Sequence, residues 1–265
     1  MIKYGTLERT CRSTEGSLPA PGVRGCCMND KSPGKTKEDK ELFELWENKI
    51  RIEVYRDIAS NKIPLWSMFH FLGHKTVAWF IKNKCKIAPN DKIFEPGCGI
   101  CYFPQFLDKS LQKHYIGLDI SKKVLDVGGS DIKKIQGDIY RLPLADGAIK
   151  YIVSVYNFEH LHRLDEALLE IIRVMDNDGA LIFAIPMEDG FLYNLGRNLT
   201  SRRLVERKYG VDYMKIIREY EHPNTALKVI NEIRERFTIT DRLYLPFLIP
   251  SININLLAVY KAIKK

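Results

Sequence analysis

KIFEPGCGICYFPQFLDKSLQKHYIGLD, residues 92–119, is the stretch that decides the fold of this chain. A short apolar run leads into the sequence EPGCG (residues 95–99), an amphipathic segment follows, and a second apolar run ends on Asp119. This order predicts a strand, a glycine turn, a helix over about residues 102–111 and a second strand.

The two glycines of this turn, Gly97 and Gly99, suit a backbone that binds a ligand. Glycine accepts a positive φ, and it lets a ligand approach the N–H groups at the start of the following helix. Asp119 follows about 20 residues later, which is typical of a carboxylate that accepts hydrogen bonds from ribose hydroxyls. The stretch therefore predicts a site for a nucleoside-containing cofactor.

Two familiar phosphate-binding loops do not fit this turn. A dinucleotide fingerprint would need glycine at position 102, where the chain has Tyr102, whose bulk blocks close approach of a pyrophosphate. The P-loop pattern G-x-x-x-x-G-K-[ST] is absent from the sequence.

The cysteines leave a redox alternative open. In a chain of this length without an export signal, they are expected to be reduced thiols. Cys98 and Cys101 form a C-x-x-C at the start of a helix, where a dithiol redox site could lie. Metal binding would need a second pair at suitable spacing, so we expect no metal ion. The six cysteines are Cys11, Cys26, Cys27, Cys85, Cys98 and Cys101.

Length and composition are those of a globular protein with one sizeable α/β domain. The chain has 265 residues and no apolar run of about 18 residues, and its N-terminus has no signal-peptide pattern, which predicts a cytoplasmic protein without a membrane span. The net charge of +8 raises the question of nucleic acid or an anionic membrane. Because the lysines are scattered and no nucleic-acid motif is present, we expect a solvated basic surface instead.

Three regions are expected along the chain. Residues 1–36 have the composition of a flexible tail, within which Met28 would serve equally well as a start. Residues 37–85 contain two helical periodicities and form an N-terminal cap, and residues 86–265 form the core. A largely helical insertion is expected over residues 187–236.

Strands and helices alternate through the core. Ser121 is a good N-cap for the helix that follows the second strand. Alternation of this kind predicts right-handed crossovers, a doubly wound parallel sheet and a ligand at the carboxyl ends of its strands. The expected strands cover about residues 92–95, 114–119, 132–136, 149–156, 181–185, 237–243 and 252–260.

Several motifs in this order resemble the class I S-adenosylmethionine (SAM) dependent methyltransferases, and among them the small-molecule, type 11-like enzymes. The resemblance implies SAM as the cofactor and a Rossmann-like, seven-stranded sheet whose last strand, here residues 252–260, runs antiparallel. The matching motifs are EPGCG at 95–99, Asp119, Gly137-Asp138 with Leu142-Pro143, NFEHL at 157–161, and RVM at 173–175 with DGA at 178–180.

The resemblance also implies a role for individual residues. Glu95, Gly97 and Gly99 would line the methionine part of SAM, and Asp119 would accept from the ribose hydroxyls. The remaining implied contacts are Ile120 on the adenine, Asp138 with Ile139 at the adenine amino group, and Tyr156 with Asn157 near the sulfonium.

Two positions depart from the family pattern. Cys101 stands where many relatives have glycine or another small residue, which crowds the start of the helix. Many relatives begin the fourth strand with an aromatic-Asp pair, whereas this chain has Ile149-Lys150. Neither departure removes an implied cofactor contact.

His160 is the candidate catalytic residue, because the segment after the fourth strand faces the methyl group in this family. A positioned histidine could remove the proton of an acceptor hydroxyl. The alternative is that His160 only caps the next helix. Candidates for the acceptor pocket, each of which could instead be a packing or surface residue, are Tyr55, His70, His74, Arg197 and His222.

The resemblance implies an enzyme that methylates a small-molecule acceptor. Arg197 opens an arginine-rich segment over residues 197–208, so the acceptor could carry a carboxylate or a phosphate. The alternatives are a tRNA or protein methyltransferase, a SAM-binding protein without catalysis, and the C-x-x-C redox protein. The sequence does not identify the acceptor or decide between O-, N- and C-methylation.

Overall fold

The computed structural model describes residues 41–42, 45–50, 53, 64–127, 129 and 131–265. The tail predicted over residues 1–36 and the pocket candidate Tyr55 lie outside the described residues, as does most of the first predicted helix.

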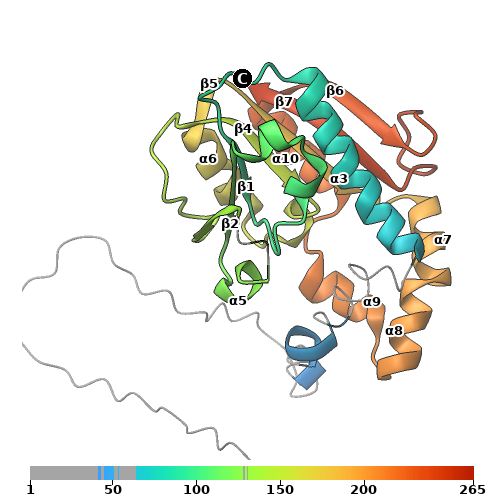
Figure 1. Ribbon diagram of the computed structural model, residues 1–265. Helices are drawn as coiled ribbons and strands as arrows, with labels where there is room; N and C mark the ends of the chain where they lie inside the picture. The colour runs from blue at the N-terminus through green and yellow to red at the C-terminus, as the bar shows by residue number, and fades with distance from the viewer. Residues whose placement is uncertain (1–40, 43–44, 51–52, 54–63, 128, 130) are drawn as a thin grey trace, which may run out of the picture.

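The described residues form a seven-stranded sheet with the order β3-β2-β1-β4-β5-β7-β6 (Figure 1). The first five strands run parallel to one another, and β7 runs antiparallel to both β5 and β6. This topology confirms the predicted fold class. The strands are β1 (Ile93–Pro96), β2 (Tyr115–Asp119), β3 (Lys133–Gln136), β4 (Ile149–Val155), β5 (Met175–Pro186), β6 (Phe237–Leu245) and β7 (Leu257–Lys264).

Helices cover both faces of the sheet. The helices α6 (Leu164–Val174) and α10 (Ala226–Arg236) pack on one face, and α3 (Pro64–Lys84) packs on the other. Strand β4 supplies both cores because its side chains alternate: Ile152 joins the first core, whereas Tyr151 and Val153 join the second. Burial on both faces explains why this strand is almost continuously apolar.

The helix predicted over residues 102–111 was wrong, because the chain makes two short turns there. They are the 3-10 turn η2 (Phe103–Phe106) and the short helix α4 (Lys109–Gln112). Asp108 between them has an extended backbone with ψ 147°. Pro104 lacks an N–H and is tolerated only in a first turn, which favours a short element at that point.

The predicted N-cap at Ser121 and the predicted start of the last strand had different outcomes. Ser121 caps α5 (Lys122–Leu125) as predicted, with its hydroxyl oxygen accepting from the N–H of Val124 at 3.4 Å. The last strand begins at Leu257 instead of residue 252. The buried Asn255 explains this difference, because its amide donates to the carbonyls of Ile249 and Ser251, both at 2.7 Å, and holds the preceding residues in a loop.

The segment between β5 and α10 contains four helical elements. Those from residue 201 onward pack with η1 (Trp46–Ile50) in a third, smaller core at the bottom of Figure 1, which includes Trp46, Val205 and Tyr213. The predicted domain limits, including an insertion over residues 187–236, stay a prediction. The four elements are α7 (Phe191–Leu199), α8 (Ser201–Tyr209), α9 (Tyr213–Ile216) and η4 (Ile217–Glu221).

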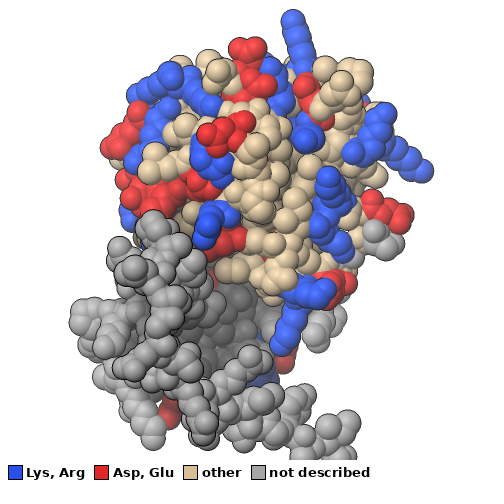
Figure 2. Space-filling model, turned by 90° about the vertical axis from the view of Figure 1, so that its left-hand side faces the viewer, with Lys and Arg blue, Asp and Glu red and all other residues tan. Residues whose placement is uncertain are grey.

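The surface in Figure 2 carries lysine and arginine interspersed with aspartate and glutamate, without a single large basic patch on that face. No helix among the described residues is long and apolar enough to cross a membrane. The cytoplasmic location expected from the sequence stays a prediction.

Candidate functional site

The turn between β1 and η2 has the backbone that its glycines predicted. Gly97 has φ +74° and Gly99 has φ +56°, both in the left-handed region. A Cβ on Gly97 would lie 2.5 Å from the side chain of Asn157, whereas a Cβ on Gly99 would meet no atom within 4 Å. Gly97 is therefore required by packing, and Gly99 leaves open space above the turn.

Asp119, at the carboxyl end of β2, ties this turn to the neighbouring strand. One carboxylate oxygen accepts from the N–H of Gly99 at 3.0 Å, and the other accepts from the N–H of Ser121 at 2.8 Å. A carboxylate has about four lone-pair sites, so each oxygen retains capacity for a ligand hydroxyl. The half-buried Asp119 therefore both shapes the turn and faces the site.

The adenine-side candidates lie on the next strand ends. Ile120 is 57 % exposed, a large apolar side chain left open to a ligand, whereas Ile139 is buried at 8 %. One oxygen of Asp138 accepts from the N–H of Tyr140 at 2.9 Å, and its other oxygen has no hydrogen bond within the described part of the chain. The second carboxylate oxygen of Asp138 and the exposed side chain of Ile120 are therefore available to a planar base.

Tyr156 and Asn157 follow β4 and point to different neighbours. The amide of Asn157 donates to the carbonyl of Pro96 at 3.2 Å and covers Gly97. Tyr156 has a left-handed φ of +54° and donates its hydroxyl to the carbonyl of Phe69 in α3 at 3.0 Å. Only Asn157 therefore lies against the glycine turn, while Tyr156 anchors α3 over the end of β4.

A buried asparagine clamps two distant segments together beside this end of β4. The side-chain amide of Asn224 donates to the carbonyls of Phe158 at 2.9 Å and Leu161 at 2.6 Å. The N–H of Asn224 also donates to the carbonyl of Glu159 at 3.2 Å. The sequence EHPN (residues 221–224) is thereby held against the turn η3 (Phe158–His160).

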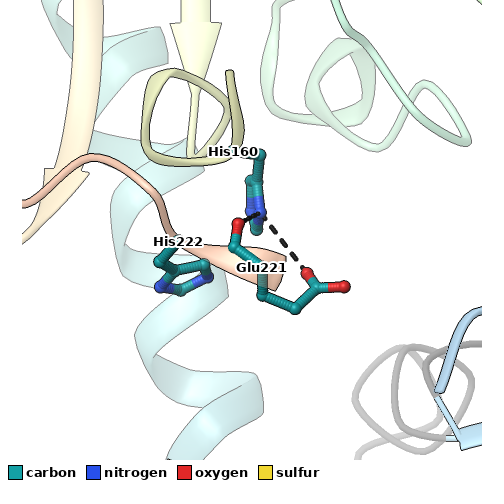
Figure 3. Close-up of side chains that lie close together, drawn as sticks. All are labelled: His160, Glu221 and His222. Atoms are coloured by element: carbon teal, nitrogen blue, oxygen red, sulfur yellow. Dashed lines mark hydrogen bonds and ion pairs between the residues drawn. The ribbon is translucent and has the colours of Figure 1, made fainter. Parts of the chain in front are cut away.

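This clamp brings His160 and His222 together, with ring centroids 4.6 Å apart and the rings nearly perpendicular (Figure 3). Nδ1 of His160 lies 2.7 Å from the carbonyl oxygen of Glu221 and 3.4 Å from its carboxylate. Nδ1 of His222 is paired with the carboxylate of Glu188. A carbonyl oxygen only accepts, so His160 carries its proton on Nδ1 and directs Nε2 elsewhere.

Burial and neighbouring charges shift the pKa values of His160 and of two glutamates beside it. Burial disfavours the charged form of His160, but the hydrogen bond and charge of Glu221 and the charge of Glu159 outweigh it, and the pKa of His160 is raised to about 9. Burial raises the pKa of Glu159 above its ordinary value. For Glu188, burial acts in the same direction, but His222 and Arg197 outweigh it and leave its pKa lowered.

Three buried polar atoms of this region have no protein partner among the described residues, namely Oε2 of Glu159, Nε of Arg197 and Oδ1 of Asn224. The guanidinium of Arg197 lies 5.5 Å from the ring centre of Tyr193, whose hydroxyl donates to Glu188 at 3.3 Å. An unpaired buried donor and acceptor are costly in a protein interior. Their presence here favours a pocket that a polar ligand completes.

The other two pocket candidates lie in α3 and have a different character. Burial lowers the pKa of His70 to about 3 and that of His74 to about 4, so both rings are neutral. They pack with Tyr156, and His74 also contacts Tyr102 at a centroid distance of 5.0 Å. We assign His70 and His74, with Tyr102 and Tyr156, to an aromatic wall. In this wall His74 packs as an uncharged ring.

The structure thus brings His160, His222 and Arg197 into one region, with His70 and His74 in the wall beside it. Sequence reasoning missed Glu188, Tyr193, Glu221 and Asn224. One signal was available in the sequence. The polar segment EHPN interrupts an otherwise helical stretch and, like the NFEHL segment after β4, contains a Glu-His pair.

The two cysteines of the C-x-x-C are both buried thiols, with their sulfur atoms 3.4 Å apart. Gly117 lies beneath them, because a Cβ there would come within 3.0 Å of either sulfur. Their side chains fill the space between the glycine turn and β2, which is a packing role.

Comparison with known proteins gives a family match within the sheet. Residues 94–183 match the family described as a methyltransferase domain. A search of curated proteins found no significant match.

Solved structures share the fold at low sequence identity. One is a Thermotoga maritima SAM-dependent methyltransferase, a possible histamine N-methyltransferase, with TM-score 0.54 and 16 % identity over 84 % of this chain and 100 % of that chain. Another is the methyltransferase in a complex with the Haloferax volcanii Trm112 activator, with TM-score 0.52 and 13 % identity over 78 % and 95 % of the two chains. A third is a Pyrococcus horikoshii protein, with TM-score 0.50 and 16 % identity over 87 % and 100 %.

The fold, the glycine turn with Asp119 and the family match together define a methyltransferase of the class I, SAM-dependent type. SAM is its cofactor. The resemblance found in the sequence is therefore confirmed for fold, cofactor and enzyme class.

Glu95 yields a prediction with a defined pH dependence. Burial raises the pKa of its carboxyl from 4.5 to about 8, although the hydroxyl of Tyr115 donates to it. The stability from this group is complete below pH 4.5 and is lost as the pH rises through 8, because the folded chain must then give up a proton that it binds more tightly than the unfolded chain. We expect Glu95→Gln, which stays neutral, to be more stable than the wild type at pH 9 and similar near pH 4.

Urea unfolding of both proteins at the two pH values measures this difference, with Glu166→Gln on the surface as the matched control. We also expect Glu95→Gln to bind SAM more weakly at pH 9, because it lacks a negative charge for the amino group of the methionine part. A stability difference that is the same at pH 4 and pH 9 would contradict the assignment of a raised pKa to Glu95.

Proposed function

We propose that the protein transfers the methyl group of SAM to a hydroxyl of a small polar molecule bound against His160. The observation that carries the proposal is the buried polar cluster beside the end of β4, in which His160, His222 and Glu221 meet and Glu159 and Arg197 each retain an unpaired atom. A cleft in which a few polar groups converge within apolar walls is typical of a small-molecule site.

The residues around the glycine turn fit SAM. We propose that Gly97, Gly99 and Glu95 hold its methionine part and that Asp119 accepts from its ribose hydroxyls. The open space above Gly99 and the remaining lone pairs of Asp119 support these roles. We assign the adenine to Ile120, Asp138 and Ile139. When bound, SAM supplies a methyl group activated by its positively charged sulfur, which a nucleophile takes by in-line displacement.

The chain's own contribution is mainly alignment and exclusion of water, which is worth about 7–11 kcal/mol in favourable intramolecular cases. Asn157 connects the cofactor turn to the acceptor region, because it covers Gly97 and is followed directly by η3. The aromatic wall of α3 lies beside the site, with Phe69 stacked on Tyr156 at 5.0 Å.

His160 is the proposed catalytic residue. Glu221 holds its Nδ1, which leaves Nε2 for the acceptor. In its charged form the ring donates to the acceptor oxygen and positions it, and in its neutral form the ring takes the proton of that oxygen. The unpaired Nε of Arg197 and Oε2 of Glu159 would bind further polar groups of the acceptor, a carboxylate or phosphate at Arg197 included.

A macromolecular acceptor is the competing function. The Haloferax neighbour is a methyltransferase in complex with a methyltransferase activator, and the net charge of +8 is compatible with binding to RNA. The enclosure of the cluster favours the small molecule, because His160 is a quarter exposed and Glu221 only 5 % exposed.

Methyl transfer from SAM labelled in its methyl group tests the proposal. The protein is incubated with pooled small hydroxyl compounds, with total tRNA and with unfolded protein, and the labelled product is fractionated by size. We expect label in the small-molecule fraction at a rate insensitive to salt. Label only in RNA, with a rate that falls steeply between 50 and 200 mM salt as counterion release requires, would overturn it.

A further inference from the structure

We propose that His160, Glu221 and His222 form a binding site for one divalent transition-metal ion, beside the place assigned to the acceptor. No spacing in the sequence suggests it, because His160 lies 61 residues before Glu221 and the two segments meet only in the fold. The binding of the ion is independent of the proposed function. The role of the ion in holding the acceptor rests on that function.

The three residues offer one ligand atom each, and these atoms all lie within 4.8 Å of one another. Atoms that share one ion at about 2.0–2.2 Å lie roughly 3–4 Å apart. Because the Glu221 carboxylate lies 3.4 Å from Nδ1 of His160, its side chain would have to rotate toward Nε2 to complete the set. The backbone beneath them is fixed, because Asn224 ties the EHPN segment to η3 with two amide hydrogen bonds.

The surroundings of the histidines match the outer shell of a metal site. Ligating histidines usually give their second ring N–H to a carboxylate or a carbonyl, which fixes the ring and leaves the other nitrogen for the ion. His222 gives Nδ1 to the carboxylate of Glu188, and His160 gives Nδ1 to the carbonyl of Glu221. Neither Nε2 has a hydrogen-bond partner among the described residues. Figure 3 shows His160 facing the backbone carbonyl and the carboxylate of Glu221, with the ring of His222 on the other side of Glu221.

The charge of the region favours a cation as well. The carboxyls of Glu159, Glu188 and Glu221 surround the two imidazoles, and the buried Oε2 of Glu159 has no hydrogen bond. A cation that binds there would gain an additional carboxylate oxygen close to its ligands.

The donor set indicates the kind of ion. Two imidazoles and one carboxylate suit Zn²⁺, Fe²⁺ or Mn²⁺, whereas Mg²⁺ and Ca²⁺ prefer a shell of oxygen atoms. Three protein ligands leave coordination positions open. We infer that an ion on Nε2 of His160 would take the place of the ring as the partner of the acceptor hydroxyl, so that the acceptor would be a compound with two neighbouring oxygen atoms that can chelate the ion.

Calorimetric titration of Mn²⁺ into the full-length protein, treated first with a chelator, tests the site. Mn²⁺ is the chosen probe because the thiols of the chain prefer softer ions. We expect one ion per chain, and an affinity at least about tenfold lower in His160→Ala and in His222→Ala. His162→Ala, which removes an exposed histidine two residues from His160, should bind Mn²⁺ like the wild type.

Titration of SAM into the same variants shows whether each still folds and keeps the separate cofactor site. Wild-type-like Mn²⁺ binding by variants that still bind SAM would overturn the proposal, as would the absence of any Mn²⁺ binding by the wild type. If SAM fails to bind while the histidine-dependent Mn²⁺ site is present, the metal site stands and the proposed function falls.

Discussion

Replacement of His160 by alanine is expected to lower kcat by about 10²–10⁴-fold, the usual contribution of a positioned acid–base group. The variant loses the ring proposed to face the acceptor, whereas the glycine turn around Gly97 and Gly99 is untouched. We therefore expect SAM to bind with nearly the wild-type affinity. Release of the demethylated cofactor, measured with an acceptor that the wild type methylates, gives kcat.

The matched control for this prediction is His162→Ala, because His162 is exposed and lies in the same short segment. It should keep the wild-type kcat. If His160→Ala turned over as fast as His162→Ala while both bound SAM, His160 would have only the capping role that the sequence also allows.

Replacement of Asp119 by alanine is expected to weaken SAM binding by more than about tenfold, as the loss of a charged hydrogen-bond partner implies. The change removes the proposed acceptor of the ribose hydroxyls. It also frees the N–H groups of Gly99 and Ser121, which the two carboxylate oxygens hold at 3.0 Å and 2.8 Å. Equilibrium binding of SAM to the variant measures the effect.

Asp126→Ala provides the comparison for this second variant, because the Asp126 side chain is 65 % exposed and, among the described residues, forms an ion pair only with Lys122, four residues earlier. Its affinity for SAM should match the wild type. A SAM affinity of Asp119→Ala equal to that of Asp126→Ala would remove Asp119 from the cofactor site.

The topology of the sheet and the position of the glycine turn could be predicted because both rest on local patterns. The apolar runs indicate the strands, and the glycines at 97 and 99 mark a turn with positive φ, which the structure has. Asp119 was predictable for the same reason, because the end of β2 follows directly from the apolar run before it.

The polar cluster could be predicted only in part, because it depends on contacts between distant residues. His160 and His222 were both candidates, but nothing local indicates that Asn224 joins their segments or that Glu188 pairs with His222. The helix predicted after the glycine turn was wrong for a related reason. The stretch after the glycine turn has helical periodicity, yet Pro104 and the extended Asp108 divide it into two turns.

Titration of SAM into the wild-type protein tests the account most directly, because every proposed role depends on a cofactor bound at the carboxyl ends of β1 and β2. We expect saturable binding of one SAM per chain, with an affinity that Asp119→Ala weakens. Absence of binding to a protein that circular dichroism shows to be folded would contradict the account.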